Sequence, residues 1–178
     1  QFVLFAYPWG KANTPLAHMQ GPRTWQRDDL QAITEHIKKQ KGVIDLGLAP
    51  EMWREATASG RGVGKSAKIS WLVDWMMTTR LGSTCIVTAN TEPQLKTRTF
   101  AEISKWTTLL LNAHWFETTV LSVKPAEWFK KHLIEQLSMD CGYYYAQGQL
   151  WSEENPDAFA GVHNPYGVMV IYDEASGI

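Results

Sequence analysis

The segment Ser59–Ser66 constrains the fold of this chain most, because it reads Ser-Gly-Arg-Gly-Val-Gly-Lys-Ser. Three glycines followed by Lys-Ser have the spacing of a phosphate-binding loop. Backbone N–H groups in such a loop wrap around phosphate oxygens, and Cβ atoms would obstruct the wrap. Lys65 places a positive charge on the β- and γ-phosphates, and Ser66 offers a hydroxyl to Mg²⁺. The nucleotide-binding residues predicted from this pattern are Ser59, Gly60, Arg61, Gly62, Val63, Gly64, Lys65 and Ser66.

A loop of this type connects a strand to a helix, and the flanking sequence is compatible with both. We expect a short strand over Trp53–Ala58. Downstream, apolar residues recur with helical spacing, which predicts a helix whose N-terminal end faces the phosphates. These residues are Ile69, Leu72, Val73, Met76 and Met77. The first position of the pattern holds Ser59 where glycine is usual, and serine also tolerates turns.

A second signal is the run Val168–Glu174, in which five apolar residues precede Asp173 and Glu174. We expect a buried strand that ends in two carboxylates. The first is placed to bind Mg²⁺, directly or through water, and the second is placed to deprotonate an attacking water molecule. Together with the phosphate-binding loop, this pair predicts an ATP hydrolase of the motor type rather than a small-molecule kinase.

The remaining segments alternate between strand and helix patterns, which predicts an α/β sandwich with a mostly parallel central sheet. Ligands bind at the carboxyl ends of strands in such sheets. We therefore expect Ser59–Ser66, Thr88–Thr91 and Asp173–Glu174 to converge on one rim. The other expected elements are an apolar strand and a Pro/Gly-rich arm over 1–24, a helix over Trp25–Gln40, a loop over 41–52, a strand over Ser83–Thr88, a helix after Thr91, β-rich stretches over 115–123 and 142–151, and a helix near Pro125–Leu137.

Composition excludes several classes of protein. The net charge of −1 rules out a chain that binds nucleic acid as a polycation, so any DNA contact must be local. The two cysteines suggest no disulfide framework, and Cys85 is expected to be a small buried apolar residue. The five histidines show no metal-ligand spacing, and no apolar run approaches transmembrane length. A reducing cytoplasm is the expected compartment.

Several residues admit two interpretations. Arg61 either reaches the γ-phosphate as an arginine finger supplied in cis or is a surface residue of a tight turn. Gln26, after Trp25, either contacts both hydrogen-bonding positions of adenine or is an exposed glutamine. The segment Thr88–Thr91 either contacts DNA phosphates or nucleotide, or caps the next helix. Three basic residues form either a nucleic-acid-binding face or an ordinary solvated face: Lys96, Arg98 and Lys105.

Four segments resemble the N-terminal ATPase domain of large terminase subunits, the DNA-packaging motors of tailed bacteriophages and prophages. The resemblance spans nearly the whole chain, and its more specific parts are the arginine in the loop and the Thr-Ala-Asn-Thr segment. The four segments are Tyr7–Gly10 with Trp25-Gln26, Ser59–Ser66, Thr88–Leu95 and Asp173–Ser176.

The resemblance implies a RecA-like (ASCE) P-loop fold in which 1–52 form an N-terminal arm and adenine-side helix and 53–178 form the ATPase core. It implies translocation of double-stranded DNA into a procapsid, with portal and small terminase subunit as partners and a homo-oligomeric ring as the assembly. The expected setting is the host bacterial cytoplasm, without a membrane, and the cofactors are ATP and Mg²⁺. The implied roles are adenine contact for Gln26, cis-acting catalysis for Arg61, phosphate and Mg²⁺ binding for Lys65, Ser66 and Asp173, and catalytic base for Glu174.

Two departures from the family pattern affect what we expect. The family's coupling triplet follows the Asp-Glu strand, whereas Thr88-Ala89-Asn90 precedes it and is not assigned that role. The sequence ends four residues after Glu174, at Ile178, so we expect the remaining strands of the sheet and a nuclease domain to be absent from this span. Two other functions stay open: a helicase or remodelling ATPase, and a nucleotide-binding structural module without turnover.

Overall fold

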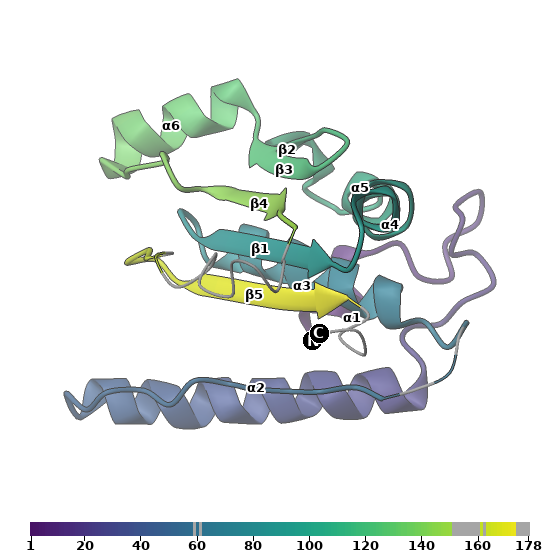
Figure 1. Ribbon diagram of the computed structural model, residues 1–178, viewed down its shortest axis with the longest axis horizontal. Coiled ribbons are helices and arrows are strands. Elements are labelled where there is room, and N and C mark those ends of the chain that lie inside the picture. The colour runs from purple at the N-terminus through teal and green to yellow at the C-terminus, as the bar shows by residue number, and fades with distance from the viewer. Residues whose placement is uncertain (59, 61, 151–160, 162, 174–178) are drawn as a thin grey trace. The chain divides into compact units, whose positions relative to one another are not determined.

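Five strands form one mixed sheet in the order β2-β3-β4-β1-β5, flanked by helices, in the computed structural model of the chain (Figure 1). The structure describes residues 1–58, 60, 62–150, 161 and 163–173. The chain is therefore an α/β protein. The strands are β1 (Thr84–Ala89), β2 (Phe116–Thr118), β3 (Ser122–Pro125), β4 (Tyr145–Gly148) and β5 (Val168–Asp173).

The sheet is parallel only in its β4-β1-β5 part, whereas we expected a mostly parallel sheet. Strand β1 pairs in parallel with both β4 and β5. Strands β2 and β3 form an antiparallel hairpin, and β3 is also antiparallel to β4. The connection between β2 and β3 is too short for a parallel crossover, which needs a dozen or more residues. The β-rich stretches expected over 115–123 and 142–151 are confirmed in β2, β3 and β4.

The helices confirm most of the sequence pattern. Helix α3 follows the phosphate-binding segment, α2 contains the helix expected over Trp25–Gln40, and α6 matches the helix expected near Pro125–Leu137. Helix α2 continues to Asp45, so the loop expected over 41–52 begins later. The helices are α1 (Phe2–Ala6), α2 (Thr24–Asp45), α3 (Lys65–Thr79), α4 (Glu92–Gln94), the π-helical turn η1 (Leu95–Thr99), α5 (Phe100–Thr108), the 3₁₀ turn η2 (Ala113–Trp115) and α6 (Glu127–Leu137).

Two expected strands are wrong. The apolar run at the N-terminus forms α1, and a run this short cannot be assigned to strand or helix by periodicity alone. Its buried residues, Val3 and Ala6, lie three positions apart, as on one face of a helix. The segment Trp53–Ala58 forms neither strand nor helix, and all six residues are exposed. Apart from Trp53 its side chains are small or polar, so it offers little apolar surface to a buried sheet position.

The chain divides into two compact units. Unit 1 contains Gln1–Pro8 and Gly64–Ile178, and unit 2 contains Trp9–Val63. Unit 1 therefore holds the sheet, α1 and every helix from α3 onward, whereas unit 2 holds α2 and the segments on either side of it. The expected boundary between residues 52 and 53 differs from this division, because residues 53–63 belong with α2 and residues 1–8 belong with the sheet.

Three aromatic rings from three helical segments pack together in the core of unit 1. The rings of Tyr7 and Trp106 meet edge to face at 5.2 Å between centroids, and Trp71 and Trp106 do so at 5.1 Å. All three side chains are buried. Edge-to-face contacts of this kind add about 0.5–1.5 kcal/mol each to the stabilisation from burial. The cluster joins the N-terminal segment to α3 and α5.

A carboxylate lies inside this core. Asp74, on α3, accepts a hydrogen bond from the Tyr7 hydroxyl at 2.6 Å and another from the Thr107 hydroxyl at 2.8 Å. Burial raises the pKa of Asp74 to about 7, although the two hydrogen bonds favour its charged form. Burial and the nearby Asp74 carboxylate raise the pKa of Tyr7 and of the Cys85 thiol above their usual ranges. Cys85 is buried and free, as expected.

We expect the stability of the chain to depend on pH through Asp74. Between about pH 4 and 7 the folded state binds this proton more tightly than the unfolded state does, so stability falls as pH rises through that window. At about 1.4 kcal/mol for each pKa unit, the loss amounts to a few kcal/mol. Asp74→Asn keeps the shape but cannot titrate, so its stability advantage over wild type should grow from pH 5 to pH 8.

Denaturant unfolding at several pH values measures this difference. Asp28→Asn, at an exposed position on α2, is the matched control and should follow the wild-type profile. If the profiles of Asp74→Asn and wild type run parallel from pH 5 to 8, Asp74 does not titrate in this window.

Candidate functional site

The predicted phosphate-binding loop, Ser59–Ser66, contains two described backbone positions that only glycine occupies without strain. Gly62 has φ +72° and Gly64 has φ +96°, both in the left-handed region. This conformation costs an L-residue with a Cβ atom about 1–2 kcal/mol of conformational free energy. Gly64 is the N-cap of α3, so Lys65 and Ser66 are the first two residues of the helix, and both are half-buried. A turn with left-handed glycines, followed at once by a helix, is the local geometry that the sequence predicts.

Helix α3 and strand β1 place Lys65 and Ser66 at the carboxyl end of the parallel strands. A turn over residues 80–83 joins α3 to β1, so the two elements run in opposite directions (Figure 1). The fifteen residues of α3 span roughly 22 Å and the six of β1 roughly 20 Å. The N-terminal end of α3 therefore lies at the level where β1 ends. This end of the sheet is also where ligands bind in α/β proteins.

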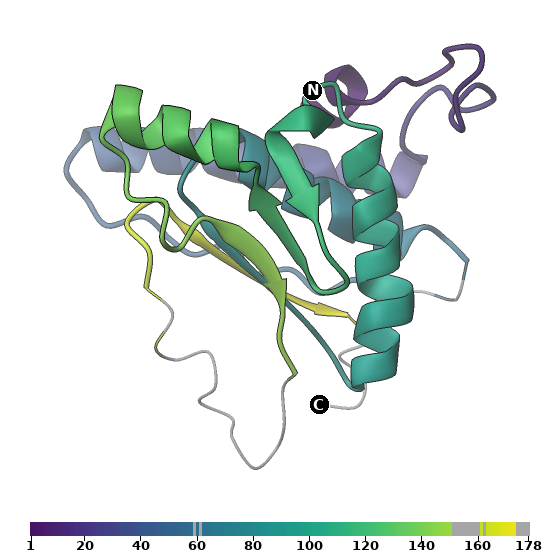
Figure 2. The same cartoon turned by 90° about the horizontal axis from the view of Figure 1, so that it is seen from above.

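Asp173 lies at the same end of the sheet. Strand β5 pairs with β1 in parallel over its whole length, and the last pair in the register is Ala89 with Asp173. The side chain of Asp173 is buried, and its Oδ2 accepts a hydrogen bond from the Thr99 hydroxyl at 2.7 Å. In Figure 2 the tip of β5 points at the rod formed by α4, η1 and α5. The structure thus brings Lys65, Ser66 and Asp173 to one end of unit 1.

Strand β5 itself differs from the expected buried strand. It is an edge strand of the sheet, and five of its six residues are exposed or half-buried. Val168 and Tyr172 are both more than one-third exposed. Asp173 is its most protected residue, because η1 covers that end of the strand through Thr99.

The segment after β1 favours helix capping over the other interpretation of Thr88–Thr91. The Thr91 side chain accepts the Gln94 N–H at 3.4 Å and is the N-cap of α4, with Pro93 in the first turn. Thr88 is buried at the end of β1, and its hydroxyl forms no hydrogen bond within the described part of the chain. Two of the three basic residues form ion pairs within their own helical segments, Lys96 with Glu92 and Lys105 with Glu102.

Unit 2 carries a hollow beside the N-terminal end of α2. The indole N–H of Trp25 donates to the Val63 carbonyl at 3.2 Å, which ties the first turn of α2 to the phosphate-binding segment. The hollow has a volume of about 430 Å³, within the range of small-ligand sites. Its lining consists of Arg23, Trp25, Asp29, Glu55, Ala56, Thr57, Ala58 and Val63.

Gln26 does not line this hollow. Its side chain is buried, and Oε1 accepts the backbone N–H of Arg23 at 2.8 Å, which closes the first turn of α2. The adenine contact expected of Gln26 stays a prediction, and its Oε1 already serves the helix end. Trp25, its neighbour in the sequence, is the residue of this pair that lines the hollow.

Three predicted residues lie outside the described residues: Ser59, Arg61 and Glu174. Among the residues that are described, no group of three or more histidine, cysteine, aspartate and glutamate side chains could hold a metal ion. Within the same residues, no helix is both long and apolar enough to cross a membrane.

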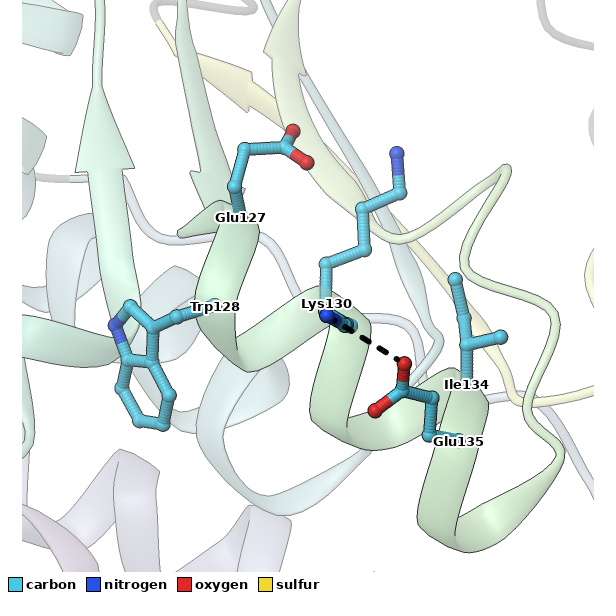
Figure 3. A pocket seen from close by; sticks show the side chains of 6 residues that line it. Glu127, Trp128, Lys130, Ile134 and Glu135 are labelled. Carbon is cyan, nitrogen blue, oxygen red and sulfur yellow. Dashed lines mark ion pairs between the residues drawn. The ribbon is translucent and has the colours of Figure 1, made fainter.

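A second hollow lies on α6 and contains none of the predicted site residues (Figure 3). Trp128 stacks on the His114 ring with an interplanar angle of 4° and donates its indole N–H to the His114 carbonyl at 3.2 Å. Lys131 and Glu135 form an exposed ion pair at 3.7 Å. The lining residues are Glu127, Trp128, Lys130, Lys131, Ile134 and Glu135.

Comparison of the chain with models of protein families, with curated proteins and with solved structures finds no match. The likeness to large terminase subunits therefore rests on the four sequence segments. In unit 1, Lys65, Ser66 and Asp173 lie at one end of the sheet. Membership of the terminase family stays a prediction.

The left-handed glycine at the start of α3 gives a testable consequence. Gly64→Ala places a Cβ atom at φ +96° and should lower the free energy of unfolding by about 1–2 kcal/mol. Gly42→Ala is the contrasting variant, since Gly42 lies within α2 with nothing within 4 Å of an added Cβ. It should raise stability by about 0.5–1 kcal/mol. Unfolding followed by circular dichroism tests both, and an unchanged or higher stability in Gly64→Ala would show that this backbone conformation is not required.

Proposed function

We propose that the chain is the ATPase part of a DNA-packaging motor of the large terminase type, with a RecA-like P-loop fold. It couples hydrolysis of ATP to the translocation of double-stranded DNA into a procapsid. The observation that carries this proposal is that Lys65, Ser66 and Asp173 all lie at the carboxyl end of the parallel strands of unit 1. A phosphate-binding helix start and a carboxylate at the end of a neighbouring strand are the two protein groups that P-loop hydrolases need.

The donor atoms present suit Mg²⁺ bound together with a nucleotide. Ser66 offers a hydroxyl and Asp173 a carboxylate, both hard oxygen ligands of the kind that Mg²⁺ prefers. In such sites Mg²⁺ takes one or two protein ligands, and phosphates and water complete its coordination. When bound, the ion neutralises charge on the β- and γ-phosphates. Lys65 and the N-terminal end of α3 hold the same phosphates.

The catalytic roles follow from position in the sequence. Glu174 comes directly after Asp173 and is the proposed base, which takes a proton from the attacking water. Arg61 is the proposed arginine finger in cis, whose charge matters most as negative charge develops on the transferred phosphoryl group. Gln26 is the proposed contact for adenine on the resemblance to the family alone.

The proposed partners follow from the same family. They are double-stranded DNA, the portal of a procapsid, the small terminase subunit and further copies of the chain in a ring, in the host bacterial cytoplasm. Because the net charge is −1, DNA contacts must come from local groups.

Two other functions share parts of this site. A helicase or remodelling ATPase would use the same phosphate-binding loop and carboxylates, and stimulation by single-stranded rather than double-stranded DNA would favour it. A nucleotide-binding structural module would bind ATP without turnover. The complete set of Lys65, Ser66, Asp173 and Glu174 favours hydrolysis over binding alone.

Removal of the lysine charge should weaken nucleotide binding. We expect Lys65→Ala to weaken the affinity for Mg-ATP by at least about tenfold, because charge-assisted hydrogen bonds contribute about 1.5–3 kcal/mol. Isothermal titration calorimetry measures this affinity. The control is Lys96→Ala, which removes an exposed lysine paired with Glu92 and should bind as wild type does. Unchanged affinity in Lys65→Ala would exclude the phosphate-binding role.

Replacement of the proposed base should separate binding from chemistry. Glu174→Gln keeps the shape and a hydrogen-bonding side chain but cannot accept a proton, so it should bind Mg-ATP normally and hydrolyse it about 10²–10⁴ times more slowly. Single-turnover hydrolysis of radiolabelled ATP measures the chemical step. A wild-type rate in this variant would mean that the base lies elsewhere, and a wild-type chain with no turnover would favour the structural module.

A further inference from the structure

The hydrogen bond between Thr99 and Asp173 joins two buried side chains from distant parts of unit 1. The Thr99 hydroxyl donates to Oδ2 of Asp173 at 2.7 Å. Thr99 is 1% exposed and Asp173 is 8% exposed. Within the described residues, Oδ1 of the same carboxylate receives no hydrogen bond. One oxygen of the carboxylate therefore accepts a hydrogen bond from the protein, and the other has no hydrogen-bond donor among the described residues.

The backbone around Thr99 is unusual and well anchored. Residues Leu95–Thr99 form a π-helical turn, closed by the hydrogen bond from the Phe100 N–H to the Leu95 carbonyl. A π turn holds more residues than an α turn, so two consecutive side chains, Thr99 and Phe100, are both buried. Leu95 and Phe100 press on Gly148 of β4, where an added Cβ would lie 2.9 Å from Phe100 Cε2. The turn that carries Thr99 is thus fixed against the sheet.

We propose that Thr99 is a positioning residue for the metal carboxylate, which holds Asp173 in one rotamer with Oδ1 directed to Mg²⁺ or its bound water. This inference rests on the proposed function, in which Asp173 serves the metal of Mg-ATP. A donor that fixes one oxygen of a carboxylate removes rotational freedom that metal binding would otherwise have to restrict. π turns of this kind are frequent at functional sites.

The same helical rod provides a matched control. Thr107 also lies on a buried face and donates its hydroxyl to a buried carboxylate, that of Asp74 at 2.8 Å. Asp74 belongs to the aromatic core of unit 1, and it is not one of the proposed metal ligands. Thr99→Val and Thr107→Val therefore each remove one hydroxyl–carboxylate hydrogen bond from the same rod, and only the first touches Asp173.

The test measures metal binding rather than turnover. Mn²⁺ replaces Mg²⁺ at oxygen-ligand sites, and its electron paramagnetic resonance signal reports the free ion. The 178-residue chain is titrated with Mn²⁺ in the presence of ADP, in wild type and in Thr99→Val, Thr99→Ser, Thr107→Val and Asp173→Asn. We expect Thr99→Val to lower the Mn²⁺ affinity by about 10–100-fold, as loss of groups that orient metal ligands commonly does. Thr99→Ser keeps the hydroxyl and should restore most of the affinity, and Thr107→Val should bind as wild type.

The outcomes separate this inference from the function on which it rests. Normal Mn²⁺ binding in Thr99→Val, together with weak binding in Asp173→Asn, would overturn the positioning role and leave the proposed function standing. An equal loss in Thr107→Val would also overturn it, because general destabilisation would then explain the effect. Normal binding in Asp173→Asn would overturn the metal assignment of Asp173 and the role of Thr99 with it.

Discussion

The carboxyl group of Asp74 is the point at which three helical segments of unit 1 meet. Tyr7 reaches it from the segment after α1, Thr107 reaches it from α5, and Asp74 itself lies on α3. A buried carboxyl group is costly unless hydrogen bonds satisfy it, and the two hydroxyls each supply one. The aromatic rings of Tyr7, Trp71 and Trp106 surround the group with apolar surface. Asp74 lies in the middle of α3, and Lys65 and Ser66 of the predicted phosphate-binding loop are the first residues of the same helix.

The rod formed by α4, η1 and α5 connects that core to the candidate site. In the middle of the rod, Thr99 contacts Asp173, and two turns further along, near the C-terminal end, Thr107 contacts Asp74. The rod also covers the carboxyl end of β5, a strand that is otherwise at the edge of the sheet. Because both hydroxyls lie on one helical rod, a shift of the rod along its axis would disturb both carboxylates together.

The sequence predicted the parts of the site that depend on local chemistry. Glycines followed by Lys-Ser placed the start of α3 correctly, and an apolar run before a carboxylate identified β5 and Asp173. The sequence did not predict the roles of Thr99 and Asp74, because each role depends on a hydrogen-bond partner more than thirty residues away in the chain. The sequence contains one sign of the role of Asp74. It is an acidic residue three positions after Trp71 and three before Met77, among the apolar residues of a predicted helix. The segment Trp53–Ala58 forms no strand because, apart from Trp53, it has little apolar surface to bury, although a strand commonly precedes such a loop.

Unit 2 is an insertion, since unit 1 is built from Gln1–Pro8 and from residues after Val63. The first eight residues are thus covalently linked to their packing partners only through the whole of unit 2. A single peptide-bond cleavage between residues 9 and 63 would turn this N-terminal piece into a separate peptide ligand of unit 1. Its attachment would then depend on concentration, because the high effective concentration provided by the chain would be lost. Only the contacts of Val3, Ala6 and Tyr7 with unit 1 would then hold these residues in place, and their loss would leave Trp106 and Asp74 open to water.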